Sequence, residues 1–522
     1  MKVVVAEKIA GAAMKLLEKV DGWKVVGPDE FAKDPKAAVA DADALIVRSA
    51  VRASAELIGD AKLLRVIGRS GVGVDNIDVD VATKRGIVVM NTPGASSVSV
   101  AELTIGLMLS MARFIPKADQ STRAGKWEKK ELQGSELAGK TLGLVGLGRI
   151  GTEVAKRAQA FGMTVIGTDP YVSPARAHEL GIKLCSLDEL YAAADYISLH
   201  VGLTHQTTRM INRDAIAKMK DSVRIVNCAR GELIDDEALG EAMSSGKVAS
   251  AALDVFTQEP PKGNALLQLT NLVATPHLGA STKEGQEATG IQIASQIRDY
   301  LLQGIAQNAV NLPSLSDQEY EQLRPYITLA SKLGSFAAQL FASNLSSIEI
   351  EYEGELGSWK TDFVRNAAVA GVMQLGSEEA VNLINARTVA DQRGVVVRET
   401  RSDPKAKVNG VQLKLTGETG GVQCRGAVVH GEHPRLTELN ETEIESRVEG
   451  NFIVIFNDDS PGVVGGIGTA LAAHGINIAR LSLGRKGKNA VAIVQVDSAV
   501  GADVLAELKK VRSVKNAVSV KV

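Results

Sequence analysis

A glycine-rich string that directly follows an apolar run constrains the fold of this 522-residue chain more than any other feature. The run Thr141–Val145 leads into Gly146-Leu147-Gly148-Arg149-Ile150-Gly151, and a helical pattern opens at Ile150. Between a strand and a helix, the first glycine allows a tight turn, the second lets a pyrophosphate approach the backbone, and the third permits close packing. The helix N-terminus then offers free N–H groups to phosphates. This context predicts a dinucleotide-binding domain; a Rossmann domain that keeps only a structural role is the alternative.

An acidic residue stands at the spacing that the same motif requires. Asp169 follows Gly151 by 18 residues, at the end of the next apolar run, and Pro170 and Tyr171 come after it. A carboxylate at this position accepts hydrogen bonds from the ribose hydroxyls and repels a 2′-phosphate, and no arginine adjoins it. The sequence therefore favours NAD over NADP as the cofactor.

Short apolar runs alternate with helical patterns on both sides of the glycine string, which is typical of parallel sheets covered on both faces. A helix is expected from Ser97 to about Arg113, and another to about Leu302 with Ser281 as its N-cap. The predicted strands of the first unit are Val3–Ala6, Ala44–Val47, Leu64–Ile67 and Ile87–Met90. Those of the second unit are Thr141–Val145, Thr164–Gly167, Tyr196–Leu199, Arg224–Asn227, Ala251–Val255 and Leu272–Ala274.

The pattern changes after a segment, Gln307–Ser316, that reads as a linker with Pro313. We expect a half-exposed strand at Ser347–Tyr352, a helix at Thr361–Asn385 and twisted antiparallel strands over Val395–Gly417. Residues 451–522 read strand–helix–strand–strand–helix–strand, which is the ferredoxin-like order. The predicted fold class is α/β with two doubly wound Rossmann-like domains, an α+β intervening domain and a ferredoxin-like C-terminal domain.

Charge and composition exclude several classes of partner. The chain has 59 basic and 61 acidic residues, a net charge of −2, which disfavours nucleic acid or an anionic membrane as the main partner. No stretch approaches 18 uninterrupted apolar residues, and the N-terminal run Val3–Ala6 is broken at once by charges, so we expect neither a spanning helix nor a targeting signal. Cys185, Cys228 and Cys424 form no C-x-x-C pair, so no metal site is predicted. We expect a cytoplasmic protein.

Three later segments each follow an apolar strand with polar residues: Asn227–Gly231, Leu253–Pro260 and Thr275–Gly279. Ligands bind beyond the carboxyl ends of the strands in a doubly wound sheet, so these turns should converge. Arginine can bind a carboxylate bidentately, histidine can accept a hydroxyl proton near neutral pH, and a carboxylate can orient that histidine. Arg230, Glu259 and His277 are therefore candidate catalytic residues, although each alone is more typical of an ordinary surface group.

These motifs resemble the D-2-hydroxyacid dehydrogenase family, and in particular its long phosphoglycerate dehydrogenase members, over essentially the whole chain. The resemblance rests on G-R-S-G-V-G-V-D-N-I-D (68–78), G-L-G-R-I-G, N-C-A-R-G, L-D-V-F-x-x-E-P and T-P-H-L-G-A-S-T. It implies that Arg230 anchors the substrate carboxylate, Glu259 partners the histidine and His277 is the acid/base. It also implies that an NAD-binding domain (98–288) is inserted into a substrate-binding domain (1–97 and 289–311).

The resemblance further implies cofactor contacts from Gly146, Gly148, Arg149, Ile150, Gly151, Asp169, Cys228, Ala229, Arg230, Asp254, His277, Gly279 and Ala280. One departure is visible. The family carries a proline in its L-H-x-P-x-T loop, whereas this chain has Gly202 in Leu199–Thr204, which predicts a more flexible loop there.

Substrate binding is implied for two arginines that each end a strand, Arg48 and Arg69, since a guanidinium matches a phosphate dianion. Lys129 matches a basic position that family members offer across a dimer interface, so we expect a homodimer or homotetramer. The implied reaction is oxidation of 3-phospho-D-glycerate by NAD at the start of L-serine biosynthesis. An unphosphorylated D-2-hydroxy acid or 2-oxoglutarate as substrate, or an NAD-sensing corepressor-like scaffold, are the alternatives.

The last 72 residues resemble an ACT domain, and residues 315–447 resemble the allosteric substrate-binding module of long family members. The resemblance implies that L-serine is an effector, held by Asn457, Asp459 and, from a partner chain, Asn477. Asn457 stands where some relatives have histidine or tyrosine, which predicts an altered affinity. The alternative is that Asp459 only caps a helix and Asn477 only turns the chain.

Overall fold

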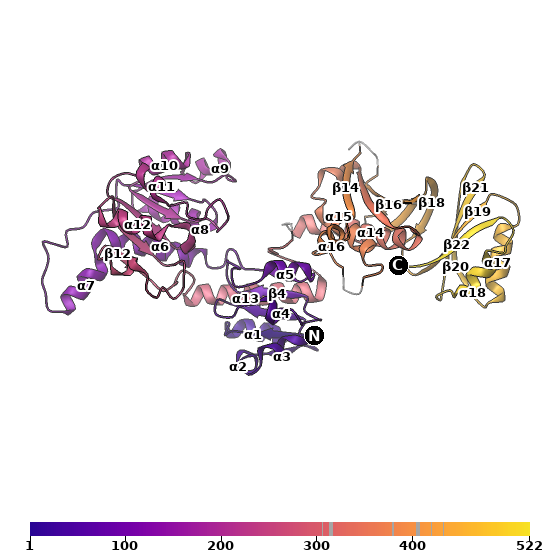
Figure 1. Ribbon diagram of the computed structural model, residues 1–522, viewed down its shortest axis with the longest axis horizontal. Helices are drawn as coiled ribbons and strands as arrows, with labels where there is room; N and C mark the ends of the chain where they lie inside the picture. The colour runs from indigo at the N-terminus through magenta and orange to yellow at the C-terminus, as the bar shows by residue number, and fades with distance from the viewer. Residues whose placement is uncertain (305, 313–316, 378–380, 403–407, 419, 432) are drawn as a thin grey trace.

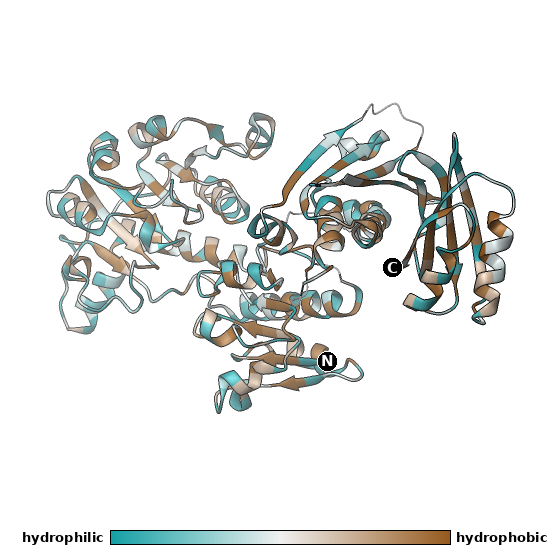
Figure 2. Cartoon of the chain, turned by 45° about the vertical axis from the view of Figure 1, so that its right-hand side comes forward, coloured by the Kyte–Doolittle hydropathy of each residue, from teal (hydrophilic) through white to brown (hydrophobic). Residues whose placement is uncertain are grey.

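The structure is a computed structural model that describes residues 1–304, 306–312, 317–377, 381–402, 408–418, 420–431 and 433–522. The first sheet is parallel, in the order β2-β1-β3-β4-β5. Successive strand residues enter two separate cores, Val4 and Leu45 on one face and Val3 and Ile46 on the other, which explains the uninterrupted apolar runs. Figure 2 shows these strands in brown beside the N-terminus. Their bounds are β1 Lys2–Val5, β2 Lys24–Val26, β3 Ala44–Val47, β4 Val66–Arg69 and β5 Val88–Met90.

The second sheet is also parallel, in the order β12-β11-β10-β9-β6-β7-β8. The order reverses between β6 and β9, where a doubly wound sheet opens its ligand crevice. Its strands are β6 Thr141–Val145, β7 Thr164–Thr168, β8 Lys183–Leu184, β9 Tyr196–Leu199, β10 Val223–Asn227, β11 Val248–Leu253 and β12 Leu272–Ala274. Two strands, β2 and β8, are missing from the sequence prediction because each is a two- or three-residue edge strand without a long apolar run.

Helices cover both faces of this second sheet. On one face α6 (Ser97–Arg113) and α8 (Arg149–Ala160) share a core with the strands. On the other face lie α10 (Leu187–Ala193), α11 (Arg213–Lys218) and α12 (Asp236–Ser244). The chain bends directly after α6, where Phe114 adopts a φ of 52°. The next helix, α7 (Ile115–Arg123), extends away from the sheet, as the left of Figure 1 shows.

The helix α13 (Lys283–Gln303) returns the chain to the first sheet. Its residues Ile293 and Ile297 share the core of β1 and β4, and α13 also packs on α1 (Gly11–Glu18). The first sheet is therefore completed by a helix that follows the second sheet in sequence. The expected N-cap Ser281 is wrong by one residue, because the hydroxyl of Thr282 accepts the N–H of Gly285 at 2.9 Å.

The segment expected to be a linker is partly fixed on the first sheet. The N–H of Val310 donates to the carbonyl of Val89 at 2.7 Å, and the side chain of Asn311 accepts the N–H of Val89 at 2.9 Å. Residues 307–312 therefore run along β5 as ordered structure, which corrects that expectation. The rest of the expected linker, 313–316 with Pro313, lies outside the described residues.

The third unit is a six-stranded sheet, β14-β13-β15-β16-β17-β18, with α14 (Asp317–Leu340) and α15 (Asp362–Met373) in its core. Two expectations are corrected. The helix that begins near Thr361 ends at Met373, before Gly376 with its left-handed φ of 72°. β14 pairs parallel with β13, since helices connect the two strands. The strands are β13 Leu345–Glu353, β14 Val396–Arg401, β15 Gly410–Gly417, β16 Gly420–Val429, β17 His433–Leu439 and β18 Thr442–Arg447.

The fourth unit is the expected ferredoxin-like domain, an antiparallel sheet in the order β20-β21-β19-β22 with two helices. Its bounds are β19 Asn451–Asp458, α17 Val463–Ala473, β20 Ile478–Lys486, β21 Asn489–Val496, α18 Ala502–Leu508 and β22 Val514–Lys521. One sheet face joins the core of the third unit, where the rings of Phe336 and Phe452 meet edge to face with their centroids 6.4 Å apart.

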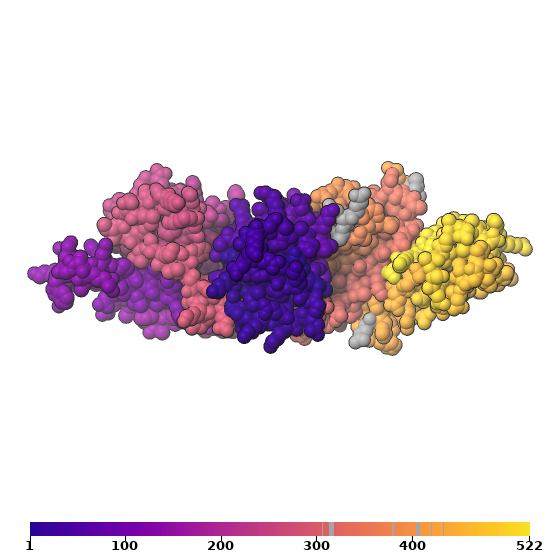
Figure 3. Space-filling model, turned by 90° about the horizontal axis from the view of Figure 1, so that it is seen from below, coloured from indigo at the N-terminus to yellow at the C-terminus, as the bar shows by residue number. Residues whose placement is uncertain are grey.

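The molecule is elongated, and along its length the units lie in the order second, first, third and fourth (Figures 1 and 3). The second sheet and α7 lie at one end, the first sheet lies near the middle and the fourth unit forms the other end. Among the described residues, no single helix has the length and apolar composition to cross a membrane; the bent pair α6 and α7 passes by those two criteria alone.

Candidate active site

A cavity of about 700 Å³ lies between the first two units and is lined by residues from both. From the first unit come Arg48, Arg69 and the glycine-rich loop after β4. From the second come residues that follow β9, β10, β11 and β12, at the carboxyl edge of the sheet. The cavity thus brings together many of the residues singled out in the sequence: Arg48, Arg69, Ile150, Cys228, Ala229, Arg230, Glu259, His277, Gly279 and Ala280.

His277 and Glu259 form the central polar pair of this cavity. Nδ1 of His277 lies 2.7 Å from Oε2 of Glu259, and the other carboxylate oxygen accepts the N–H of Phe256 at 3.1 Å. With Nδ1–H donating to the carboxylate, Nε2 is left as the proton acceptor. About half of the His277 side chain is exposed (47%), so it can meet a ligand in the cavity. The pair has the geometry of a general base held by a carboxylate.

The turn that carries His277 is shaped by the buried carboxylate of Asp254. Its Oδ1 accepts from the hydroxyl of Thr275 at 2.6 Å and from the N–H of Leu278 at 2.7 Å, and its Oδ2 accepts from the N–H of Gly279 at 2.8 Å. His277 itself has a φ of 54°, a conformation that these bonds hold in place. Asp254 is fully buried and does not line the cavity, so its role here is to position the turn.

Arg230 is placed by the loop after β10 and meets a partner across the cavity. The buried Asn227 donates to the carbonyl of Arg230 at 2.7 Å and accepts the N–H of Ala229 at 3.0 Å. The guanidinium of Arg230 pairs with Asp75 of the first unit through Nε at 2.9 Å and Nη2 at 2.8 Å. The guanidinium of Arg230 is therefore already paired with a carboxylate of the first unit.

The phosphate-site candidates Arg48 and Arg69 end two neighbouring strands of the first sheet. Glu7 fixes the loop after β3 by accepting the N–H groups of Arg48 at 2.7 Å and Val51 at 3.0 Å. Nε of Arg69 is buried without a hydrogen-bond partner among the described residues. Burial, with the positive charge of Arg230 next, lowers the pKa of Arg69 to about 10, so it remains a cation at neutral pH.

Sequence reasoning missed the residues that support these side chains. Asp75, Asn76, Asn227 and Glu7 act through hydrogen bonds to backbone or to Arg230, and Asn76 donates to the carbonyls of Arg48 and Val51 at 2.9 and 2.7 Å. Asp75 and Asn76 end the string G-V-G-V-D-N. Polar residues at the end of a glycine-rich loop are a sequence signal that could have indicated these supporting residues.

The glycine loop after β6 fits a dinucleotide. Gly146 has a φ of 96°, and a Cβ there would lie 2.5 Å from the carbonyl oxygen of His200. A Cβ on Gly151 would lie 2.2 Å from the carbonyl oxygen of Gly146, whereas Gly148 is exposed with open space around it. The loop is therefore closed on the protein side and open at Gly148, where a pyrophosphate could approach the backbone.

Asp169 lies at the end of β7 and is tied to that same loop. Its Oδ2 accepts the N–H of Leu147 and its Oδ1 accepts the N–H of Tyr171, both at 2.8 Å. A carboxylate has about four acceptor positions, so each oxygen keeps capacity for a ribose hydroxyl. The exposed Arg149 donates to the carbonyl of Pro93 at 2.7 Å, which links the loop to the segment between the two units.

Two further titratable groups line the cavity but do not suit proton or nucleophile chemistry. Burial lowers the pKa of His200 to about 4, so it is neutral at pH 7, and its Nε2 lies 2.9 Å from the hydroxyl of Ser198. Burial raises the pKa of the Cys228 thiol to about 12, so it stays protonated. Among the described residues, no group of three metal-ligating side chains is arranged to hold a metal ion.

Four further predicted residues lie away from both the cavity and the glycine loop. Lys129 is exposed in the segment after α7 and does not line the cavity of its own chain. Asp459 precedes α17 and pairs with Nε of Arg485 at 3.4 Å, while Asn477 follows α17 and donates to Asp497 at 2.8 Å. Asn457 is buried at the end of β19, with its Oδ1 unpartnered among the described residues. Asp459 and Asn477 flank opposite ends of one helix, so a single chain does not bring them together.

Comparison with known proteins identifies the family. Residues 105–279 match the D-isomer specific 2-hydroxyacid dehydrogenase NAD binding domain, 322–440 the D-3-phosphoglycerate dehydrogenase intervening domain and 452–513 the ACT domain. D-3-phosphoglycerate dehydrogenase of Methanocaldococcus jannaschii is 41% identical over 519 residues, 99% of each chain. The chain belongs to the D-3-phosphoglycerate dehydrogenase family. The enzyme of Bacillus subtilis in this family is 37% identical and covers 95% of this chain and 94% of its own.

Solved structures match the dehydrogenase half. A glyoxylate reductase from Paecilomyes thermophila is 35% identical with a TM-score of 0.54, and covers 59% of this chain and 98% of its own. D-lactate dehydrogenase from Aquifex aeolicus, solved with NAD and lactic acid, is 30% identical with a TM-score of 0.54. The match covers 60% of this chain and 100% of that one. The predicted fold class is confirmed: an NAD-binding Rossmann-like domain, an intervening domain and an ACT domain in one dehydrogenase chain.

Proposed function

We propose that this enzyme oxidises 3-phospho-D-glycerate to 3-phosphohydroxypyruvate with NAD, the first step of L-serine biosynthesis. The observation that carries the proposal is the convergence of Arg230, Glu259 and His277 with Arg48 and Arg69 in one cavity. The first three suit a 2-hydroxy acid, and the two further arginines suit a phosphate dianion on the same molecule. The proposed location of the reaction is the cytoplasm.

Each residue has a distinct task in the reaction. Arg230 binds the substrate carboxylate, which replaces Asp75 as its partner. Nε2 of His277 accepts the proton of the 2-hydroxyl group, and the carboxylate of Glu259, 2.7 Å from Nδ1, stabilises the imidazolium that forms. NAD would be held by its pyrophosphate at the loop from Gly146 to Gly151, and its nicotinamide would supply the acceptor for the hydride of carbon 2 of the substrate. Arg48 and Arg69 bind the phosphate at the far end of the substrate.

NAD rather than NADP is the proposed cofactor. Asp169 ends β7 beside the glycine loop, and its carboxylate would repel a 2′-phosphate while accepting a ribose hydroxyl. The remaining proposed cofactor contacts are Gly146, Gly148, Arg149, Ile150, Gly151, Cys228, Ala229, Arg230, Asp254, His277, Gly279 and Ala280. The proposed domain division is 1–97 with 289–311, 98–288, 315–447 and 451–522.

The experiment is to measure NADH formation from 3-phosphoglycerate, D-lactate and D-2-hydroxyglutarate, with NAD and with NADP, in the parent chain and Arg69→Ala. We expect kcat/KM for 3-phosphoglycerate to be the highest with NAD. Loss of a charged hydrogen bond should lower it about 10–100-fold in the variant, while oxidation of D-2-hydroxyglutarate to 2-oxoglutarate changes little. Arg52→Ala, an exposed arginine that does not line the cavity, is the matched control.

Other outcomes point to the alternatives. An equal loss on both substrates in Arg69→Ala would contradict a phosphate contact and favour an unphosphorylated 2-hydroxy acid or 2-oxoglutarate. NADH binding without turnover of any of these acids would favour an NAD-sensing scaffold and contradict the enzymatic proposal.

L-serine is the proposed effector of a homodimer or homotetramer. Asp459 would accept the amino group of serine and Asn477 of a partner chain would complete the site, since the two residues flank opposite ends of α17 within one chain. Asn457 lies buried at the end of β19, two residues before Asp459. Lys129 lies in the exposed segment after α7, where Trp127 is 85% exposed; this projecting segment suits contact with a partner chain.

Calorimetry with L-serine tests the regulatory proposal in the full chain. We expect serine to bind and to lower dehydrogenase turnover, and Asp459→Ala to abolish both effects without changing basal kcat. Asp503→Ala, an exposed carboxylate in the first turn of α18, is the control. Absence of serine binding at millimolar concentration would leave the ACT domain as a structural element and would overturn the proposal.

A further inference from the structure

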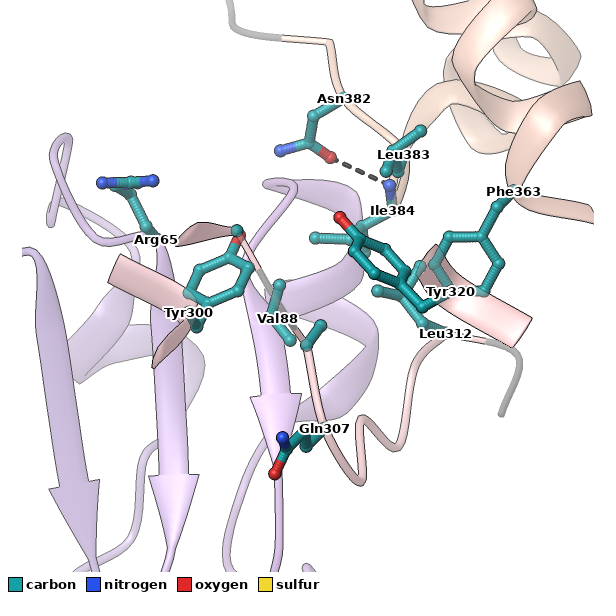
Figure 4. Close-up of a pocket in the computed structure, with 12 residues that line it drawn as sticks. Arg65, Val88, Tyr300, Gln307, Leu312, Tyr320, Phe363, Asn382, Leu383 and Ile384 are labelled. Carbon is teal, nitrogen blue, oxygen red and sulfur yellow. Dashed lines mark hydrogen bonds between the residues drawn. The ribbon is translucent and has the colours of Figure 1, made fainter. Parts of the chain in front are cut away.

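A second cavity, of about 290 Å³, lies where the first sheet meets the intervening domain (Figure 4). Four parts of the chain surround it: the residues around β4 and β5, the end of α13 with residues 306–312, the start of α14, and Phe363 of α15 with Asn382–Ile384. None of its lining residues lines the catalytic cavity, so the two are separate sites. Its volume is at the lower end of the range that small-molecule sites occupy.

Two tyrosine hydroxyls and one guanidinium are the polar groups of interest. In Figure 4 the hydroxyls of Tyr300 and Tyr320 point toward one another across the cavity. Neither hydroxyl has a hydrogen-bond partner among the described residues. The guanidinium of Arg65 lies 5.7 Å from the centre of the Tyr300 ring and forms no ion pair within the described part of the chain. The two hydroxyls thus face each other, and the exposed Arg65 stands beside Tyr300 at one end of the same cavity.

The rest of the wall is mostly apolar, with Asn382 and Gln307 as its polar side chains. Val88, Leu312, Phe363, Leu383 and Ile384 enclose the space below and beside the tyrosines. Asn382 is already engaged, since it accepts the N–H of Ile384 at 2.9 Å and donates to the carbonyl of Gly86 at 2.8 Å. A ligand that fits must therefore be apolar over most of its surface, with one acceptor group at the Arg65 end.

We propose that this cavity binds a small monocarboxylic acid with an apolar body. The carboxylate would accept from the guanidinium of Arg65 and from the hydroxyls of Tyr300 and Tyr320. Hydrogen bonds between a carboxylate and an arginine are stronger than those between neutral groups. The two tyrosine hydroxyls would gain the acceptor that they lack. The apolar body would lie among Phe363, Leu312 and Ile384.

The position of the cavity gives such a ligand contacts on two domains. β4 begins at Val66, next to Arg65, and ends at Arg69 in the catalytic cavity. α13 likewise runs from the turn at Ser281, which lines the catalytic cavity, to Tyr300 and Gly304 at this one. A bound acid would bridge the intervening domain to the two elements that reach the active site.

Calorimetry on the full chain with 3-phenylpropionate tests the proposal, with uncharged 3-phenylpropanamide as the matched probe. We expect the acid to bind at millimolar concentration or below and the amide to bind at least about tenfold more weakly. Arg65→Gln and Tyr320→Phe should each weaken binding of the acid about tenfold or more while dehydrogenase kcat is retained. The controls are Lys62→Gln, an exposed charge three residues before Arg65, and Tyr326→Phe, which packs on Trp359 outside the cavity.

Three results would overturn the proposal: no heat of binding at millimolar acid, equal affinities for acid and amide, or unchanged affinity in both cavity variants. Arg230→Ala separates this site from the catalytic one. Binding that is lost in Arg230→Ala but kept in Arg65→Gln would mean that the probe occupies the catalytic cavity. Because the readout is heat of binding, the outcome does not depend on which hydroxy acid the enzyme oxidises.

Discussion

The hydrogen bond between His277 and Glu259 depends on supports that neither residue supplies. Asp254 holds the turn of His277 through three hydrogen bonds, and the N–H of Phe256 holds one oxygen of Glu259. The imidazole is therefore positioned before any substrate arrives, which lowers the cost of orienting the base. Burial lowers the pKa of His200 to about 4, so this residue is neutral at pH 7 and offers no substitute base in the same cavity.

His277→Ala should lower kcat for 3-phosphoglycerate oxidation by about 10²–10⁴-fold, because removal of a positioned base has this typical effect. NADH affinity, measured by fluorescence titration, should stay within about twofold, since the glycine loop and Asp169 lie elsewhere in the site. His178→Ala, on the exposed side of the same domain, should behave like the parent chain. Full turnover in folded His277→Ala would contradict the assignment of the base.

At the scale of elements, the loops after β10 and β11 lie so close together that only a residue without a Cβ fits at position 231. A Cβ on Gly231 would lie 2.0 Å from the carbonyl carbon of Phe256 and 2.3 Å from the N of Thr257. Both obstacles are backbone, so neither can move aside cheaply. The close approach sets Arg230 beside the loop that carries Glu259.

Gly231→Ala should destabilise the NAD-binding domain by about 1–3 kcal/mol, which corresponds to about 2–4 °C in Tm per kcal/mol for a domain of this size. It should also raise KM for the substrate, because Arg230 and Glu259 move apart. Gly240→Ala in α12 is the control: its Cβ would meet one leucine methyl at 3.4 Å, so stability should be equal or slightly higher. Differential scanning calorimetry compares them. An unchanged Tm in Gly231→Ala would argue against the tight contact.

At the scale of the whole molecule, the intervening and ACT domains form one body through a shared core. Phe452, Val454 and Ile493 of the ACT sheet belong to the same apolar cluster as Phe336. The link to the catalytic half is thinner, with the side chain of Asn382 on Gly86 and the second cavity beside it. The two solved relatives, of which 98% and 100% match 59% and 60% of this chain, do not include these two domains.

A chain ended at residue 312 should therefore fold and keep dehydrogenase activity within about tenfold, without response to serine. A chain ended at residue 449 should expose the apolar surface that the ACT sheet covers, and should aggregate or bind hydrophobic dyes. Light scattering and the NADH assay compare the two. Insolubility of the shorter chain together with a stable, monodisperse longer one would contradict this division of the molecule.

The sequence by itself determined the order of strands and helices, the glycine loop and the identity of the catalytic candidates, because periodicity and special backbone positions are local properties. Only the tertiary structure decided which residues support them. Asp75, Glu7 and Asn227 act across contacts between segments far apart in the chain or through backbone groups, which no local pattern records. The parallel register of β14 and the edge strands β2 and β8 were decided in the same way, since strand pairing depends on the neighbour that folding supplies. The second cavity has the same origin: Arg65, Tyr300 and Tyr320 meet because two domains pack together.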